Sequence, residues 1–191
     1  MEEIKDVIQA ALELNDFCVQ QNWRFCFIGG IAIQRWGEPR FTKDADISLL
    51  TSFENDELYV DALLGRFRPR IPDARDLALQ RRVLLLETAD SVALDVSLGG
   101  LPFEERSVSR AVDYTIMKGK SIRVCCAEDL IVYKAFASRG LDWIDVERIV
   151  QRQGRKLNLD LVFEELTPLV ELKEEPEILV KLQKMIDQWI D

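Results

Sequence analysis

Apolar and polar residues alternate with a helical period at the start of the chain. Residues 3–20 place apolar side chains along one helix face, which predicts an opening amphipathic helix. The apolar run at 24–28 then predicts a buried strand that stops at Gly29-Gly30. A short helix is predicted over 31–36, so the chain opens with a helix–strand–turn–helix order.

Short runs of apolar and β-branched residues predict a sheet in the first two thirds of the chain. The remaining strands are predicted, in chain order, at 44–50, 83–87, 92–97, 114–117 and 121–125. We expect a hairpin around Ala89-Asp90 and a second strand pair around 118–120.

The segments between these strands are less regular. Thr51-Ser-Phe-Glu54 has the pattern of a capping box and predicts a helix over 52–65, and a further short helix is predicted at 103–110. The stretch 66–82 carries six arginines and two prolines, and we interpret it as a basic connection with a single helical turn. It is either an ordinary solvated connection or a place where an RNA or nucleotide acceptor docks.

From Ala127 onward the pattern becomes helical throughout. Helices are predicted at 127–138, 142–153, 158–171 and 176–190. The expected fold class is therefore α+β (α/β): a small mixed sheet with flanking helices over 1–125, followed by a helical region over 126–191 that packs on it.

Charge and composition exclude several kinds of chemistry. The net charge is −9 and the chain has no histidine, which excludes histidine triads, imidazole general bases and histidine-ligated zinc. Acid–base and metal chemistry must then depend on carboxylates, lysines and bound ions. The acidic balance also argues against broad, sequence-independent binding of nucleic acid.

The cysteines and the apolar runs indicate a location. Four cysteines are present without a CxxC spacing, and two of them, Cys125 and Cys126, are adjacent, which suits neither a zinc knuckle nor a disulfide framework. The N-terminus has no signal-peptide core, and no run approaches the roughly 20 apolar residues of a membrane span. We expect a cytoplasmic protein in a reducing compartment, with no membrane partner.

A strand that ends in two glycines and opens a helix can bind an anion. Backbone N–H groups at Gly29-Gly30 would face a phosphate together with the helix dipole, and glycine allows a close approach. The alternative is a strand–helix junction that uses glycine for geometric reasons alone.

Asp44 and Asp46 start a predicted strand and project from the same side of it. Two converging carboxylates are unfavourable unless a positive charge lies between them, and hard oxygen ligands favour Mg²⁺ or Mn²⁺ over zinc. The alternative is a solvated turn, with Lys43 nearby.

Asp95 is the third candidate carboxylate. It lies in the middle of an apolar strand and projects from the face opposite Leu94 and Val96, where an aspartate requires a partner. If this strand lies beside 44–50, three carboxylates meet over one face of the sheet. Asp90 is the rival third ligand, although it falls in the expected hairpin turn.

These residues resemble a known superfamily. A Gly-Gly pair, thirteen intervening residues, Asp-x-Asp and a later apolar-Asp-apolar strand are similar to the polymerase-beta-type nucleotidyltransferases. The fuller string resembles minimal nucleotidyltransferases and AbiEii-type abortive-infection toxins; it reads Gly29-Gly30-x-Ala32, then Arg40-x-Thr42-x-Asp44-x-Asp46. The Gly-Gly turn stands where the family more often has glycine–serine.

The resemblance continues into the helical region, so that it spans about residues 24–150. Such proteins often follow the sheet with a helix that carries a lysine and then an Arg…Asp…Asp run, which resembles Lys134, Arg139, Asp142 and Asp145 here. The alternatives are that Lys134 is a surface lysine, that Asp142 caps the next helix, and that Asp145 favours its dipole.

The resemblance implies a magnesium- or manganese-dependent nucleotidyltransferase that uses a nucleoside triphosphate. Asp44, Asp46 and Asp95 would hold the metals, and Asp95 would also deprotonate the acceptor hydroxyl. The residues implied for nucleotide binding are Gly29, Gly30, Arg40, Thr42 and Lys134, and Thr42 is alternatively an ordinary strand hydroxyl. Residues 1–125 would form the catalytic core.

The acceptor implied is an RNA end, a protein hydroxyl or a small molecule such as an aminoglycoside, and an antitoxin protein is a possible partner. The alternative function is a catalytically inactive module that keeps the fold for protein interaction. A dinucleotide-binding fold of Rossmann type is excluded because no Gly-x-Gly-x-x-Gly follows the first strand.

Overall fold

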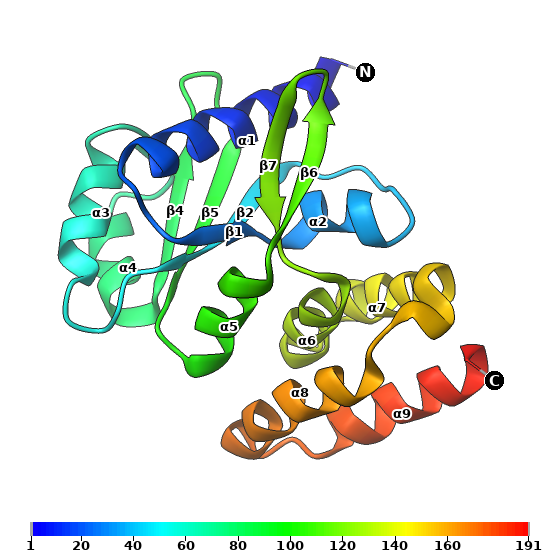
Figure 1. Cartoon of the computed structure of the whole chain (residues 1–191). Helices are drawn as coiled ribbons and strands as arrows, with labels where there is room; N and C mark the ends of the chain where they lie inside the picture. Colours follow the sequence, from blue (N-terminus) through cyan, green and yellow to red (C-terminus); the bar gives the residue numbers. More distant parts are fainter. Residues whose placement is uncertain (1, 191) are drawn as a thin grey trace. The chain divides into compact units, whose positions relative to one another are not determined.

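Seven strands form one mixed sheet in the computed structural model, which describes residues 2–190 (Figure 1). The strands are β1 (Phe25–Phe27), β2 (Asp44–Leu50), β3 (Arg68–Pro69), β4 (Val83–Glu87), β5 (Ala93–Gly99), β6 (Val112–Met117) and β7 (Lys120–Val124). Their order across the sheet is β3-β4-β5-β2-β1-β7-β6. The predicted α+β (α/β) class with a mixed sheet is therefore confirmed.

The pairing of the strands places β2 at the centre of the sheet. β2 runs parallel to β5 and antiparallel to β1, and β1 runs parallel to β7. The outer pairs β4–β5, β3–β4 and β6–β7 are antiparallel, and β6 contains an irregularity between Thr115 and Met117. The predicted hairpin at 83–97 is confirmed by the β4–β5 pairing.

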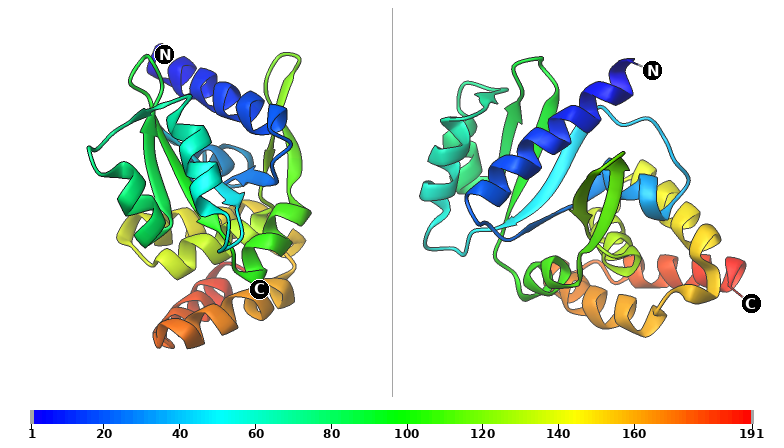
Figure 2. Two further views of the ribbon diagram at one scale, coloured as in Figure 1. Left: turned by 90° about the vertical axis from the view of Figure 1, so that its left-hand side faces the viewer. Right: turned by 45° about the horizontal axis from the view of Figure 1, so that its top comes forward.

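One face of the sheet is apolar because alternate residues of each strand point to it. Its central residues are fully or almost fully buried: Ala45, Ile47 and Leu49 on β2, and Leu94, Val96 and Leu98 on β5. Helix α1 (Glu2–Gln20) packs against these two strands and lies along the sheet in both views of Figure 2. The same alternation turns Asp44 and Asp46 to the opposite face.

Helix α5 (Pro102–Arg110) packs against β1 and β2. Pro102 occupies its first turn, where the missing N–H costs nothing. The Glu104 carboxylate accepts hydrogen bonds from the N–H groups of Gly100 and Leu101, both at 2.8 Å, and so fixes the start of the helix.

The chain divides into two compact units. The first contains the residues up to Ile31 together with Phe41–Val124, and the second contains Ala32–Arg40 together with the residues from Cys125 onward. Helix α2 (Gly29–Trp36) begins in the first unit and continues into the second. A catalytic role for residues 1–125 as a separate domain stays a prediction.

The second unit is helical. Its helices are α6 (Ala127–Ala137), α7 (Gly140–Gln153), α8 (Leu159–Lys173) and α9 (Glu177–Trp189). Residues 32–40 are attached to this unit by hydrogen bonds: the Trp36 indole donates to the Cys125 carbonyl at 2.8 Å, and the Gln153 amide donates to the Trp36 carbonyl at 2.6 Å. None of the helices within residues 2–190 is both long enough and apolar enough to cross a membrane.

The capping box predicted at Thr51–Glu54 is wrong. The helix that follows, α3 (Asp56–Leu64), starts at Asp56, and Ser52 has a left-handed backbone with φ of 56°. The Thr51 hydroxyl donates to the Asp56 carboxylate at 2.5 Å instead of accepting a backbone N–H. The Thr51 side chain, on which the predicted capping box depended, is therefore bonded to a residue five positions further along the chain.

The stretch 66–82 is more ordered than its prolines suggested. It contains the two-residue strand β3 and the eight-residue helix α4 (Ala74–Arg81). Pro72 lies just before this helix and does not interrupt it, and the small side chains of Ala74 and Ala78 are buried. The prediction of only a single helical turn in this stretch is therefore wrong.

Candidate active site

The register of β2 and β5 brings three carboxylates together. Asp46 pairs directly with Asp95 across the two parallel strands, and Asp44 lies on the same face of β2. Asp44, Asp46 and Asp95 each offer one carboxylate oxygen, and the three atoms lie within 4.8 Å of one another. The predicted adjacency of the two strands is confirmed. The rival Asp90 is exposed, in the turn between β4 and β5.

The two glycines are needed because other side chains approach them closely. Gly29 has φ of +59°, and a Cβ atom placed there would lie 2.0 Å from Oδ2 of Asp46. A Cβ atom on Gly30 would lie 2.1 Å from Oγ1 of Thr42. The Gly30 N–H donates to Oδ2 of Asp46 at 3.4 Å, so the first turn of α2 faces a site carboxylate. Phosphate binding at this turn stays a prediction.

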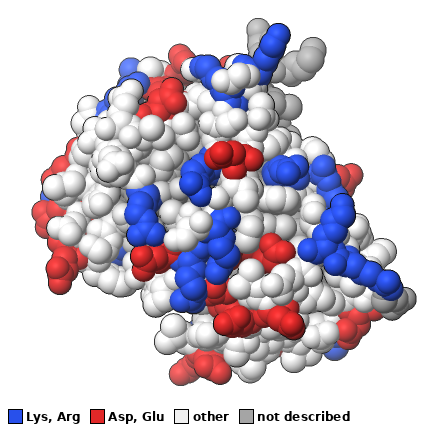
Figure 3. All heavy atoms as spheres, in the orientation of Figure 1, with Lys and Arg blue, Asp and Glu red and all other residues white. Residues whose placement is uncertain are grey.

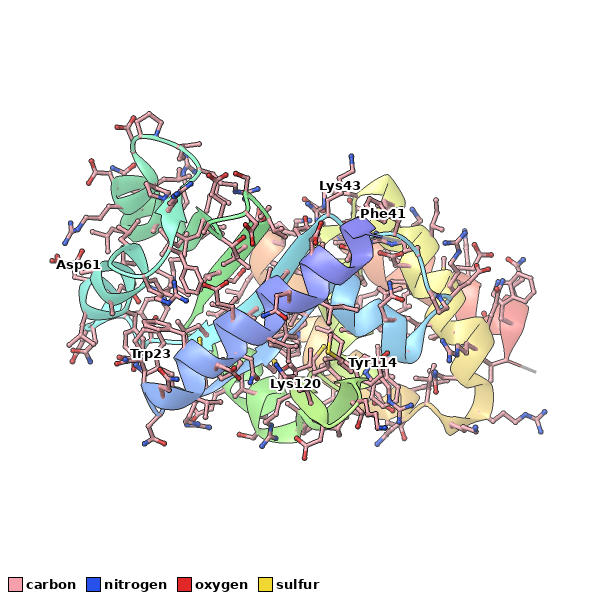
Figure 4. The ribbon with its side chains drawn as sticks, turned by 90° about the horizontal axis from the view of Figure 1, so that it is seen from above. Trp23, Phe41, Lys43, Asp61, Tyr114 and Lys120 are labelled. Carbon is pink, nitrogen blue, oxygen red and sulfur yellow. The ribbon has the colours of Figure 1, made fainter. Side chains whose placement is uncertain are left out.

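Thr42 holds one of the aspartates in place. Its hydroxyl donates to Oδ1 of Asp44 at 2.8 Å, from the connection that leads into β2. Its neighbours Phe41 and Lys43 lie at one end of β2 in Figure 4, and Trp23 lies towards the other. The acidic group therefore occupies one end of the central strand.

Arg70, which the sequence analysis did not select as a site residue, contacts the third carboxylate. Its guanidinium forms an ion pair with Asp95, and the two side chains are 29% and 30% exposed. Burial raises the pKa of Asp95, Arg70 lowers it, and Asp44 raises it further, so that the pKa lies above its ordinary value. Only the pairing of β3 with β4 would have revealed Arg70, because it places Arg70 opposite Leu85 and therefore on the same face as Asp95.

The other arginines of the stretch 66–82 are mostly engaged elsewhere in the first unit. Arg66 pairs with Glu13 at 2.5 Å, and Arg75 pairs with Glu57 at 3.0 Å and with Asp61 at 2.7 Å. Arg82 pairs with Asp56. Basic and acidic side chains also lie interspersed over the face drawn in Figure 3. With Arg70, four of the six arginines that suggested an acceptor-binding stretch thus have acidic partners within the first unit.

Lys134 and Arg40 form ion pairs with aspartates of α7 in the second unit. The Lys134 ammonium lies 3.0 Å from both Asp142 and Asp145, and Lys134 is only 8% exposed. Arg40 donates two hydrogen bonds to Asp145, at 2.8 and 2.9 Å. The interpretation of Lys134 as a surface lysine is therefore wrong.

Asp142 also stabilises the start of α7, the helix that it was expected to cap. It lies in the first turn of α7 and accepts a hydrogen bond from the Arg139 N–H at 3.3 Å. Burial would raise the pKa values of Asp142 and Asp145, but hydrogen bonds and charges from Arg139 and Lys134, and from Arg40 and Lys134, outweigh it and lower both. Both carboxylates are therefore held ionised.

The structure thus separates the predicted site residues into two groups. The first unit brings together Gly29, Gly30, Thr42, Asp44, Asp46 and Asp95. The second unit brings together Arg40 and Lys134 on Asp145. Their roles as ligands of metal and nucleotide stay predictions.

Comparison with known proteins agrees with this geometry. The chain is similar in structure to an antigenic nucleotidyltransferase-like protein from Paracoccidioides brasiliensis, with a TM-score of 0.55, 13% identity, and 94% of this chain and 93% of the other covered. It is also similar to the antibiotic-resistance factor ANT(2″)-Ia, with a TM-score of 0.54, 15% identity, and 90% and 96% of the two chains covered. At these identities the likeness concerns the fold.

Family models give a match that covers most of the chain, whereas a search of curated proteins gives no match. Residues 14–179 match the model described as "Nucleotidyl transferase AbiEii toxin, Type IV TA system". Both the α/β fold and the acidic group on β2 and β5 are consistent with this match. The chain is a nucleotidyltransferase and belongs to the AbiEii toxin family.

Proposed function

We propose that this protein transfers a nucleoside monophosphate from a nucleoside triphosphate to an acceptor hydroxyl, with Mg²⁺ or Mn²⁺ held by Asp44, Asp46 and Asp95. The observation that carries this proposal is the approach of three carboxylate oxygens to within 4.8 Å of one another beside the first turn of α2. These donors are hard oxygens without histidine or thiolate, which fits a hard divalent ion.

When bound, the metal would supply charge neutralisation at the triphosphate and a lower pKa for the acceptor hydroxyl. The protein residues have separate tasks. Thr42 orients Asp44 through its 2.8 Å hydrogen bond. The raised pKa of Asp95 suits the group that takes the proton of the acceptor hydroxyl.

The transfer step forms one bond to the α-phosphorus and breaks another. The acceptor oxygen forms a bond to the α-phosphorus while the bond between this phosphorus and the α–β bridging oxygen breaks. Pyrophosphate leaves, and the acceptor proton passes to Asp95. We assign the N–H groups of Gly29-Gly30 to the phosphates, because a helix start with open glycines favours anions.

Arg40 and Lys134 are the cations that we assign to the triphosphate. Their support is that Asp145 positions both side chains: it accepts two hydrogen bonds from Arg40 and lies 3.0 Å from the Lys134 ammonium. Asp145 restricts both cations before any substrate arrives, which reduces the entropy that binding would cost.

The family description supports a role as a toxin that is controlled by an antitoxin. The acceptor is an RNA end, a protein hydroxyl or a small molecule. Induced expression of the protein should stop growth of a bacterial host, and the Asp46→Ala variant should not, if the transfer reaction is the toxic event.

The reaction is tested by incubating the protein with each α-labelled nucleoside triphosphate, Mg²⁺ or Mn²⁺, and separated RNA, protein and small-molecule fractions of a lysate. We expect label in one fraction, release of pyrophosphate and no transfer by Asp46→Ala. Asp90→Asn is the matched control, because Asp90 lies outside the acidic group. Transfer that is undiminished in Asp46→Ala, or no label with any nucleotide in any fraction, would contradict the proposal.

A further inference from the structure

Arg70 reaches Asp95 because of the way the edge strand β3 is aligned. Arg68 pairs with Glu87 and Pro69 with Leu86, so Arg70 lies opposite Leu85, to whose carbonyl its N–H donates at 3.1 Å. Leu85 in turn pairs with Asp95, and Asp95 pairs with Asp46. One row across the sheet thus contains Asp46, Asp95, Leu85 and Arg70. The Arg70 side chain crosses over Leu85 to the Asp95 carboxylate.

The backbone of Arg70 is restrained by the sheet, whereas its side chain is held by the ion pair with Asp95. The hydrogen bond to Leu85 fixes the main chain, and Pro69 and Pro72 restrict the backbone on either side. The side chain is 29% exposed and has solvent beside it. The guanidinium can therefore leave Asp95 by rotating about its side-chain bonds, without any movement of the strand.

The Asp95 carboxylate is also the third member of the acidic group. A guanidinium at Oδ1 of Asp95 and a divalent ion beside the same carboxylate would bring two positive centres close together, where they repel each other. A doubly charged ion that also contacts Asp44 and Asp46 has the stronger interaction. The guanidinium and the divalent ion therefore compete for the negative charge of Asp95.

We propose that Arg70 is an exchangeable counter-ion of Asp95, which occupies this carboxylate in the metal-free protein, is displaced when the divalent ion binds, and thereby lowers the metal affinity of the site. This inference rests on the proposed function, because it needs the acidic group to bind metal. Because Asp44, Asp46 and Asp95 bring carboxylate oxygens within 4.8 Å of one another, the cation that pairs with Asp95 offsets their repulsion in the metal-free fold.

Arg68 supplies a matched control. It lies two residues earlier in the chain, at the start of β3, and on the same face, and among residues 2–190 it forms no ion pair. Arg68→Ala and Arg70→Ala therefore remove the same charge from the same edge of the sheet, and only the second removes a contact with Asp95. The backbone hydrogen bond to Leu85 is kept in Arg70→Ala.

The test measures Mn²⁺ binding to the chelator-treated full chain by calorimetry, without nucleotide. We expect Arg70→Ala to bind Mn²⁺ roughly two- to fivefold more tightly than Arg68→Ala, which is the effect of a partly exposed ion pair. Arg70→Lys should lie nearer to wild type than Arg70→Ala does, because it keeps the charge. Should Arg70→Ala fold poorly, Arg70→Gln keeps the length of the side chain and removes the charge.

Equal Mn²⁺ affinity in Arg70→Ala and Arg68→Ala, or weaker binding in Arg70→Ala, would overturn the inference. The result is distinguishable from a failure of the proposed function. If wild type binds no Mn²⁺, or if Asp95→Ala binds it as tightly as wild type, the metal site itself is misassigned. If Asp95→Ala loses affinity while the two arginine variants agree, only the role of Arg70 is wrong.

Discussion

Asp95 on β5 is partly buried and Asp145 on α7 is fully buried, and their pKa values move in opposite directions. Burial raises the pKa of each carboxyl group. At Asp145 the hydrogen bonds from Arg40 and Lys134 outweigh burial, and the pKa falls. At Asp95 a single guanidinium, from Arg70, is not enough to outweigh burial and the nearby Asp44, and the pKa rises.

The aspartates of the helical unit and those of the sheet therefore have different roles. Asp142 and Asp145 each have two cationic partners, and their charges contribute to the cohesion of the helical unit. On the sheet, Asp44 accepts a hydrogen bond from the neutral hydroxyl of Thr42, and Asp95 has one exchangeable cation. A cluster of carboxylates whose negative charge is not neutralised by cationic side chains attracts a cation from solution.

The largest effect is expected from a change on the sheet. Asp46→Asn should reduce the rate of nucleotidyl transfer by on the order of 10³-fold, because a metal ligand is worth several kcal/mol at the transition state. The free energy of unfolding should stay the same or rise, since the change relieves repulsion among the carboxylates. Single-turnover kinetics and urea unfolding measure the two quantities. Activity within tenfold of wild type would remove Asp46 from the metal site.

The corresponding change in the helical unit should lower the free energy of unfolding. Asp145→Asn leaves Arg40 and Lys134 without their shared carboxylate, and breaking a buried ion pair from one side costs about 3–5 kcal/mol. Urea unfolding should show this loss, whereas Glu171→Gln on the exposed face of α8 should change stability by less than about 0.5 kcal/mol. Equal stability of the two variants would mean that the acidic pair does not hold the unit together.

Gly29 allows a test of the close approach at the site. Gly29 and Gly154 have similar positive φ angles, +59° and +53°, but only Gly29 has Asp46 at the position of a Cβ atom, whereas Gly154 has nothing within 4 Å. Gly29→Ala should therefore cost about 1–3 kcal/mol more than Gly154→Ala, and it should weaken nucleotide binding. Equal unfolding midpoints would show that Asp46 moves aside without cost.

The dependence of stability on pH should differ between the two groups. A lowered pKa at Asp145 stabilises the fold above the unfolded-state pKa of about 3.9, and this contribution is lost as the pH falls through the folded pKa. A raised pKa at Asp95 has the opposite sign, and its contribution is lost as the pH rises through the folded pKa.

Unfolding free energies measured between about pH 3 and pH 7 should therefore lose part of their acid-side slope in Asp145→Asn. Asp95→Asn should instead gain stability relative to wild type towards neutral pH. Parallel profiles for the two variants would contradict the contrast between the groups.

The acidic group could be predicted from sequence because its cause is local. Asp44 and Asp46 face the same way by strand alternation alone, and Asp95 stands out as a charge in an apolar strand. The partnership of Asp95 with Arg70 could not be predicted, because it depends on the pairing of a two-residue strand that two prolines concealed.

The ion pairs of the second unit were beyond prediction for a different reason. Lys134 and Asp142 lie on separate helices and Arg40 lies far away in sequence, so their contact follows from how the helices pack and not from periodicity. Thr51 shows a different error, in which the side chain of a recognisable capping motif bonds instead to Asp56, the first residue of the helix that actually forms.

The two edges of the sheet also affect how the protein behaves at high concentration. β3 is only two residues long and ends in Pro69, which has no N–H to offer, and β6 on the other edge is interrupted between Thr115 and Met117. A long, regular edge strand would recruit the same strand of another copy and start aggregation. With short or irregular strands at both margins, this seven-stranded sheet gives neighbouring molecules little template for growth of a β-structured aggregate.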